Sequence, residues 1–210
     1  MALILTSASG PRHVASMLSR RLILMGLCAL PLPAHAMLRR YELEPHASRA
    51  GFTYLMNGAM RKGEMPVGRA DFRIDPTDLA ASSADVTLRA DQVRTGFFLF
   101  TGILKSATML DTDRFPAIRF VSTAVKPAPS GRLSDGAKLA GDLTIRDVTQ
   151  AVTFDTVFTP RAGSTPNDLD RLSVRLSGRI SRSSFGASGY KALVGDEVGL
   201  SVLMAMRAIN

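Results

Sequence analysis

The sequence predicts an all-β protein: a single antiparallel barrel of about eight strands, with one short helix near its mouth. Three observations predict this fold. Apolar and polar residues alternate along several short segments, as they do in a strand with one buried and one solvated face. Gly, Pro, Asp and Ser separate these segments at short intervals, which is typical of antiparallel connections. One segment alone has apolar residues at helical spacing.

The clearest strand is predicted at 172–181, where apolar residues and Gly178 alternate with serines and arginines. Regular alternation also predicts strands at 84–89, 139–145 and 152–155. Less regular candidates are 51–56, 67–74, 118–125 and 198–206. Together these segments account for about eight strands.

The helix is predicted over 97–109, with Thr95 as its N-cap and Pro116 beyond its end. A helix in an all-β chain has to bury its apolar stripe, and the mouth or flank of a barrel is the natural place for it. Two stretches rich in Pro, Gly, Ser and Asp, 126–137 and 161–170, are predicted surface loops. Neither is long enough to divide the chain, so residues 37–210 are predicted to form one domain.

Residues 1–36 have the organisation of a signal peptide. Arg20 and Arg21 precede an apolar run at 22–30, and residues 34–36 supply the small-x-small pattern of a cleavage site. The apolar run is short of the roughly 20 residues that span a bilayer. We therefore expect cleavage near Ala36 and export to the periplasm, by the general secretory or the twin-arginine route. Met17 is an alternative start.

The basic composition does not by itself indicate a nucleic-acid partner. The chain has 26 Lys and Arg against 18 Asp and Glu. Removal of the signal peptide, which holds three arginines and no acid, leaves 174 residues with a net charge of +5. An exported protein meets no genome, so no nucleic acid is expected as a partner.

No catalytic or metal-binding motif stands out. The mature chain has no Cys and one histidine, His46, so a Cys/His metal cluster is excluded and a nucleophile-base pair would have to use His46. Asp111, Thr112 and Asp113 lack the third acid and the glycine of a calcium loop, and are predicted to form a turn. We expect a protein without catalysis, metal or cofactor.

Four short motifs lie in order along the chain. The first motif is an aromatic residue followed by a carboxylate, Pro and a nearby Ser, and the second is a Leu-Lys-Ser followed by an aromatic-Pro turn and a strand. The third is a Gly-x-Leu-Thr-Ile hairpin and the fourth is an Ile-x-Arg-x-x-Phe-Gly turn. They lie at 41–48 with Phe52, at 104–106 with 115–122, at 141–149, and at 180–186. Together these motifs resemble those of the YceI family of exported lipid-binding proteins.

Three positions depart from the family pattern. The family usually has Arg-Asp-x-His before the Leu-Lys-Ser, where this chain has Phe100, Thr101, Gly102 and Ile103. Ala47 separates the His and Ser of the first motif, and Asp147 replaces the hairpin glycine. Any ligand contact made by the missing polar residues does not carry over.

The resemblance implies a lipocalin-like periplasmic barrel that sequesters or carries a polyisoprenoid or a similar long-chain amphipathic lipid. Each buried CH₂ of such a chain contributes roughly 0.8 kcal/mol, so an apolar tunnel binds it without a catalytic group. We expect the inner surface to include Phe52, Phe72, Phe120, Leu143, Phe154, Leu176 and Met204, and the mouth to include Phe97, Phe100 and Ile103. The same residue types also fill an ordinary core, so this lining is a hypothesis.

Two groups of basic residues are candidates for contact with charged lipids. Lys105, Arg114 and Arg119, near the helix and its following turn, would meet the polar head of a ligand. Arg171, Arg175 and Arg179 fall on one face of a strand, either as a solvated face that resists edge pairing or as a contact to an anionic membrane.

Two other functions are compatible with the sequence. One is an envelope stress or regulatory protein with a closed barrel that acts through its surface. The other, and the weakest, is an envelope hydrolase.

Overall fold

The computed structural model describes residues 38–161 and 168–209, which belong to one compact unit, His35–Asn210. The expected signal peptide lies outside the described residues. Nearly all regular structure is β, in eleven strand segments of one antiparallel sheet. The segments are β1 Arg39–Leu43, β2 Arg49–Met56, β3 Ala59–Met65, β4 Val67–Ile74, β5 Ser83–Arg89, β6 Arg94–Thr95, β7 Ala117–Pro127, β8 Ala137–Ile145, β9 Val148–Pro160, β10 Arg171–Ser181 and β11 Val194–Ile209.

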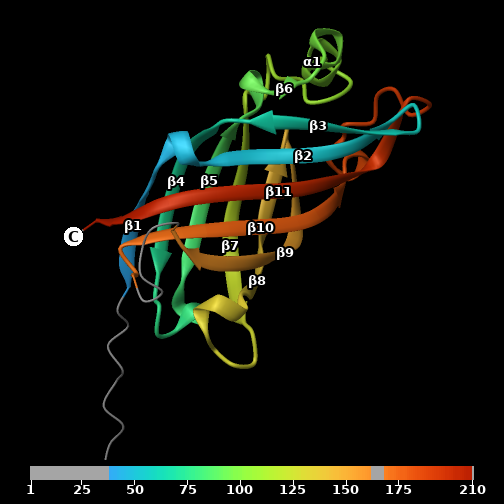
Figure 1. Cartoon of the computed structure of the whole chain (residues 1–210). Helices are drawn as coiled ribbons and strands as arrows, with labels where there is room; N and C mark the ends of the chain where they lie inside the picture. Colours follow the sequence, from blue (N-terminus) through green and yellow to red (C-terminus); the bar gives the residue numbers. More distant parts are fainter. Residues whose placement is uncertain (1–37, 162–167, 210) are drawn as a thin grey trace, which may run out of the picture. The chain divides into compact units, whose positions relative to one another are not determined.

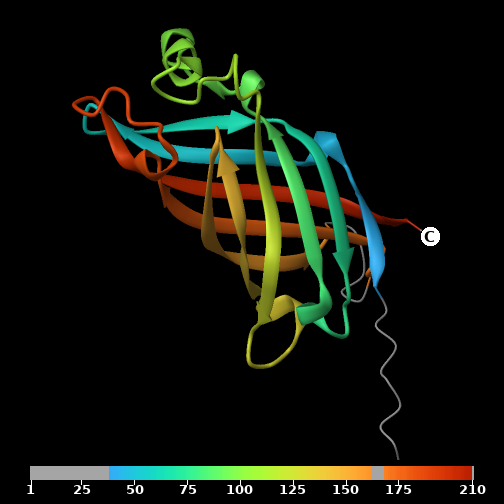
Figure 2. The same ribbon diagram turned by 180° about the vertical axis from the view of Figure 1, so that it is seen from behind.

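The sheet closes on itself as an eight-stranded barrel (Figures 1 and 2). β1 and β2 follow one another along β11, and they pair on their other side with β4 and β3 respectively. β1 and β2 together therefore act as one long strand with a single break, and so do β3 and β4. β5, β7, β8, β9 and β10 complete the ring, and the β1–β11 pairing closes it. The fold expected from alternation is confirmed.

Both breaks in the long strands coincide with a proline. Pro66 separates β3 from β4, and Pro45 begins the 3-10 turn between β1 and β2. Proline has no N–H to donate to a sheet ladder, so it interrupts a strand or ends it. The β2–β3 hairpin turns at Asn57 and Gly58, whose φ angles of 48° and 75° are those of a type I′ turn.

The helix is shorter than the sequence predicts. α1 spans Phe98–Lys105, and its N-cap is Phe97, which makes no side-chain capping bond. The expected N-cap, Thr95, instead donates from its hydroxyl to the carbonyl of Phe97 at 2.8 Å. Residues beyond Ser106 turn tightly, with the amides of Met109 and Asp111 both donating to the Ser106 carbonyl. Helical spacing alone did not reveal this turn.

β1, β3 and β6 were not expected from the sequence. β3 is exposed on both faces along most of its length, because it extends beyond the packed part of the barrel toward α1. It therefore lacks the alternation that marks a half-buried strand. Among the described residues, no helix is long and apolar enough to cross a membrane.

Two hydrophobic clusters fill the barrel. One, which includes Phe120, Phe154 and Leu104 of α1, occupies the half of the barrel nearer the helix. The other, which includes Tyr41, Phe72 and Met206, occupies the half where β1 closes the ring. Most residues that line the cavity of the barrel belong to the first cluster.

Candidate ligand-binding cavity

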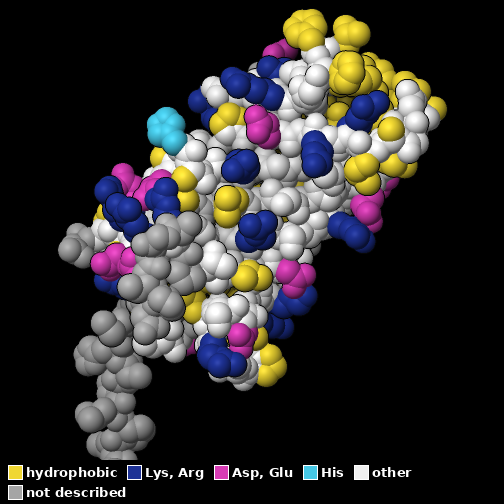
Figure 3. All heavy atoms as spheres, viewed as in Figure 1, with side chains coloured by type: hydrophobic (Ala, Val, Ile, Leu, Met, Phe, Trp, Pro, Cys, Tyr) yellow, Lys and Arg dark blue, Asp and Glu magenta, His cyan; other side chains and the backbone are white. Residues whose placement is uncertain are grey.

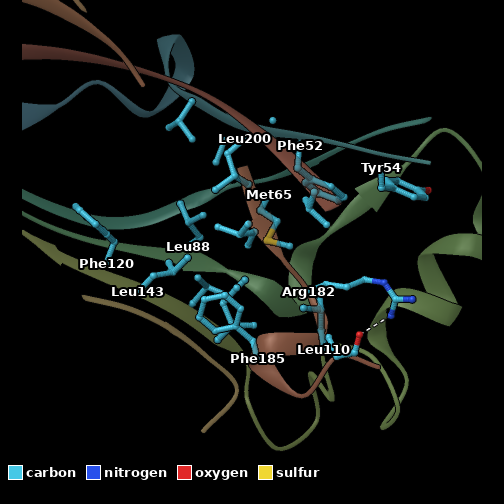
Figure 4. A pocket seen from close by; sticks show the side chains of 18 of the residues that line it. Phe52, Tyr54, Met65, Leu88, Leu110, Phe120, Leu143, Arg182, Phe185 and Leu200 are labelled. Atoms are coloured by element: carbon cyan, nitrogen blue, oxygen red, sulfur yellow. Dashed lines mark hydrogen bonds between the residues drawn. The ribbon is translucent and has the colours of Figure 1, made fainter. Parts of the chain in front are cut away.

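A cavity of about 160 Å³ lies inside the barrel, mostly within the first cluster, and Val86 and Met204 of the second cluster also contribute to its wall. Its lining comes from most strands of the ring, from Leu104 of α1, and from the turns at 109–110 and 185–187. Figure 4 shows Phe52, Met65, Leu88 and Phe185 around this space, with Arg182 and Leu110 together at one end. Apart from Tyr54 and Arg182, every lining side chain is apolar or absent. A cavity of this chemistry favours hydrocarbon over water.

Three phenylalanine rings of the lining lie against glycines. A Cβ atom on Gly63 would sit 2.2 Å from Cζ of Phe52, and one on Gly178 would sit 2.4 Å from Cδ1 of Phe154. The third ring, Phe120, covers Gly141 in the same way. Each glycine leaves room for a ring to lie along the barrel wall, so the interior stays open.

Arg182 is the one charged side chain of the lining, and its donors are used by the protein itself. Its side chain is buried, and it donates to the carbonyls of Gly195 at 2.9 Å, Gly189 at 2.9 Å and Val194 at 2.8 Å, and to that of Ala187. Ala187 and Gly189 belong to the loop between β10 and β11, and Val194 and Gly195 are the first residues of β11. Arg182 therefore holds this loop over one end of the barrel rather than offering a free guanidinium to a ligand.

Burial raises the pKa of the other polar lining group, the Tyr54 hydroxyl. Its ring stacks on that of Phe52, with centroids 5.9 Å apart. The phenol is therefore neutral at ordinary pH.

The structure places six of the ten expected lining residues on the cavity wall. These are Phe52, Phe120, Leu143, Phe154, Leu176 and Met204. Contact of these side chains with a ligand stays a prediction.

Four expected residues lie elsewhere. Phe72 points inward but packs in the second cluster, because its place on β4 lies toward the β1 end of the barrel. Phe100 and Ile103 pack on the outside of the first cluster as partly buried residues of α1, where Leu104 alone reaches the cavity. Phe97 is 57% exposed. The helical stripe showed which residues are apolar, but not which one turns inward.

The three cations expected at a ligand head do not line the cavity. Arg119 lies on the outer wall and pairs with both carboxylate oxygens of Asp85, at 3.0 and 2.7 Å. This pairing lowers the pKa of Asp85. Arg114 is largely exposed beside Asp111, and Lys105 ends α1 half-buried. Sequence reasoning missed Arg182, although the Ile-x-Arg motif contains it.

The arrangement offers little to catalysis or metal binding. His46 is exposed, and among the described residues no hydrogen bond joins it to a hydroxyl. The nearby Ser48 donates to the carbonyl of Glu44 at 2.9 Å and accepts from the amide of Ala205 at 2.9 Å, so it ties the β1–β2 break to β11. Within residues 38–161 and 168–209, no three His, Cys, Asp or Glu side chains gather as a metal would need.

Comparison with known families decides the affiliation of this barrel. The YceI-like domain model matches residues 41–206, which is most of the chain and includes part or all of every strand of the ring. The chain belongs to the YceI-like family. The expected affiliation is confirmed.

Curated YceI-like relatives match a part of their length. The chain is 30% identical over 122 residues to the UPF0312 protein SAS2572 of Staphylococcus aureus, covering 57% of this chain and 64% of the relative. It is 28% identical over 131 residues to Protein YceI of Escherichia coli, covering 62% of this chain and 65% of that one. The matched region thus spans slightly less than two thirds of these relatives.

Solved YceI-like structures confirm the fold. Burkholderia cenocepacia BcnA superposes with a TM-score of 0.67 at 19% identity, covering 78% of this chain and 99% of that one. A polyisoprenoid binding domain from Saccharophagus degradans superposes with a TM-score of 0.57 at 12% identity, covering 80% and 98%. At these identities the structural similarity establishes the barrel fold. It does not establish the ligand of this protein.

Proposed function

We propose that this protein is exported to the periplasm, where it binds a polyisoprenoid or a similar long-chain amphipathic lipid inside its barrel, without catalysis. The observation that carries the proposal is the cavity inside the barrel, whose wall is apolar except for Tyr54 and Arg182. Membership of the YceI-like family and the fold shared with a polyisoprenoid binding domain support it. Residues 1–36, with their basic, apolar and small-residue regions, support export.

The cavity is small for a long chain. Its volume of about 160 Å³ is close to that of protein cavities that hold a benzene-sized molecule, and below the roughly 300–1,000 Å³ of pockets for larger ligands. Binding of a full isoprenoid therefore requires lining side chains to move. Several are only partly buried, including Phe52, Leu88 and Leu200, and Met65 and Met109 are unbranched and adaptable. We propose that the ligand widens the cavity as it enters.

The decisive experiment compares the native mass of the protein purified from the periplasm with its mass after organic extraction. We expect a mass difference that matches one lipid, which the extract then identifies. The extracted protein should bind an added isoprenyl alcohol and gain thermal stability with ligand concentration, because a ligand that binds only the folded state stabilises it. Absence of both a native lipid and any binding would exclude the carrier function.

The small cavity also favours one alternative, a closed barrel that acts through its surface in envelope stress or regulation. That function predicts a normal fold and no lipid in the same mass measurement. The hydrolase alternative predicts turnover of ester or phosphoester substrates that falls when His46 is replaced. We expect no turnover, since His46 has no hydroxyl partner among the described residues.

A further inference from the structure

The end of the barrel that carries α1 has a concentration of exposed apolar side chains. Of the ten large hydrophobic residues that are exposed in the described chain, seven lie there, and Phe98 at 90% and Leu99 at 74% are the most exposed of all. Figure 3 shows these side chains gathered over α1 and toward the tip of the β2–β3 hairpin. We call the seven residues the apical patch: Leu55, Met60, Phe97, Phe98, Leu99, Tyr190 and Leu193.

Contacts between three segments make the apical patch continuous. The guanidinium of Arg61, on β3, lies 5.7 Å from the ring centre of Phe97 at the start of α1. Leu55 pairs with Met60 across the hairpin. At the hairpin tip, the amide of Asn57 donates to the carbonyl of Leu193 at 2.9 Å, which joins the hairpin to the loop that carries Tyr190.

The segments that form the apical patch also carry a strong positive charge. These three segments, 55–64, 94–105 and 189–193, contain five cations and one acid, Glu64. The cations are Arg61, Lys62, Arg94, Lys105 and Lys191. These segments thus contribute +4 of the +5 carried by residues 37–210. The remaining surface is close to electrically neutral in sum, with many of its arginines paired to carboxylates, as Arg119 is to Asp85.

Apolar side chains surrounded by cations match the interface of an anionic bilayer. Exposed aromatic and aliphatic side chains enter the boundary between head groups and acyl chains, while Lys and Arg remain at the negative surface. A second copy of this chain is a poor partner, because two such patches would bring ten cations together. α1 also joins the two surfaces: Phe98 and Leu99 face outward, and Leu104 of the same helix lines the cavity.

We propose that the apical patch docks the protein on anionic phospholipid membranes, with Phe98 and Leu99 inserted at the interface. This places membrane contact at the α1 end and not on the arginine row of β10, the location considered from the sequence. The inference goes beyond lipid binding in the cavity, and either can hold without the other.

A single tryptophan reports insertion directly, since the chain has none of its own. With vesicles containing phosphatidylglycerol, Phe98→Trp should show a blue-shifted emission that brominated acyl chains quench. Val157→Trp, at an exposed apolar position on β9, is the matched control and should show neither effect. An unshifted and unquenched Phe98→Trp in the presence of excess vesicles would overturn the proposal.

Co-sedimentation with vesicles tests the apolar side chains and the cations of the patch separately. The double variant Phe98→Ser, Leu99→Ser should lower partitioning to phosphatidylglycerol vesicles by about tenfold or more, and Arg61→Glu, Lys62→Glu should do the same on anionic vesicles only. The control Arg171→Glu, Arg175→Glu carries the same charge change on the outer face of β10 and should bind nearly as the parent does.

Three results would contradict docking by the apical patch. In the first, the parent protein binds phosphatidylcholine vesicles as strongly as anionic ones. In the second, the β10 control loses binding while the patch variants retain it, and in the third, the parent is a dimer that Phe98→Ser, Leu99→Ser makes monomeric. Native mass measurement on the same variants keeps the two proposals distinguishable, because a patch variant that no longer docks should still hold its cavity lipid.

Discussion

At the scale of single residues, the width of the cavity depends on glycines that face aromatic rings. Phe52 and Phe154 lie along the wall only because Gly63 and Gly178 have no side chains. Gly141 has the same relation to Phe120 and lies on the inner face with Leu143, as alternation predicts. A Cβ there would also lie 2.5 Å from the backbone carbonyl of Val121, so Gly141→Phe would distort the strand as well as fill the cavity.

Gly63→Ala is the cleaner test of this relation. The three atoms nearest to the new methyl group are all at the far end of the Phe52 ring, which has open space to enter, so the ring should swing into the cavity. We expect a loss of stability on the order of 1 kcal/mol, and much reduced recovery of bound lipid. Urea unfolding and native mass measurement check these outcomes.

Gly96→Ala is the matched control, because nothing lies within 4 Å of its Cβ position. It should retain both stability and lipid. Equal lipid recovery from Gly63→Ala and Gly96→Ala would show that the ring does not limit the cavity.

At the scale of elements, the loop between β10 and β11 depends on one side chain. From a buried position, Arg182 donates to two carbonyls of this loop and to the first two carbonyls of β11. A lysine places all its donors on a single nitrogen and cannot span the same acceptors. The motif that resembles the family's Ile-x-Arg turn is thus explained by loop closure.

Arg182→Lys should therefore destabilise the folded protein. Carbonyls left unpaired at the cavity end should reduce the free energy of unfolding by about 2–3 kcal/mol. Arg179→Lys on β10, where the arginine side chain is exposed beside Glu197, should change the free energy of unfolding by less than about 0.5 kcal/mol. Chemical denaturation measures both, and similar values for the two variants would rule out this role for Arg182.

α1 can be strengthened without touching its contacts. Gly102 lies in the helix, is exposed, and has nothing within 4 Å of its Cβ position. Gly102→Ala should stabilise the helix by about 0.5–1 kcal/mol, because alanine has the higher helix propensity. Global melting reports this gain only if α1 unfolds together with the barrel. Slower hydrogen exchange of the α1 amides is the local readout, and faster exchange would contradict the helix.

At the scale of the whole molecule, two tyrosines couple barrel stability to alkaline pH. Burial raises the pKa of Tyr41 and of Tyr54 above the ordinary value of 10.0. Because the folded state holds these protons more tightly than the unfolded chain does, their contribution is complete below about pH 10 and is lost as the pH rises through the folded pKa.

The barrel should consequently lose stability above about pH 10, and Tyr54→Phe should lose less of it. Denaturant titrations on either side of that pH measure the loss, and the ultraviolet absorbance of tyrosinate shows when each group ionises. Ionisation of both Tyr41 and Tyr54 at the ordinary pH of a free tyrosine, with the barrel still folded, would contradict their burial.

Alternation along the chain was enough to assign the barrel, because a period of two residues shows which side chains face inward wherever one face of a strand is wet. It succeeded for β10 and β8, and failed for β3, which is exposed on both faces. The inward residues Phe154 and Phe72 look alike in sequence, yet one borders the cavity and the other fills the second cluster. Depth along the barrel axis follows from strand stagger, which local pattern does not contain.

The same limit applies to α1, to the glycines and to Arg182. Helical spacing indicated an apolar segment, but only its packing against the ring decided that Leu104 turns to the cavity while Phe98 and Leu99 face solvent. The contact of Gly63 with Phe52 joins neighbouring strands, and the bonds of Arg182 join the end of β10 to the following loop and to the start of β11. Such contacts depend on register and loop path, which form only when the barrel closes.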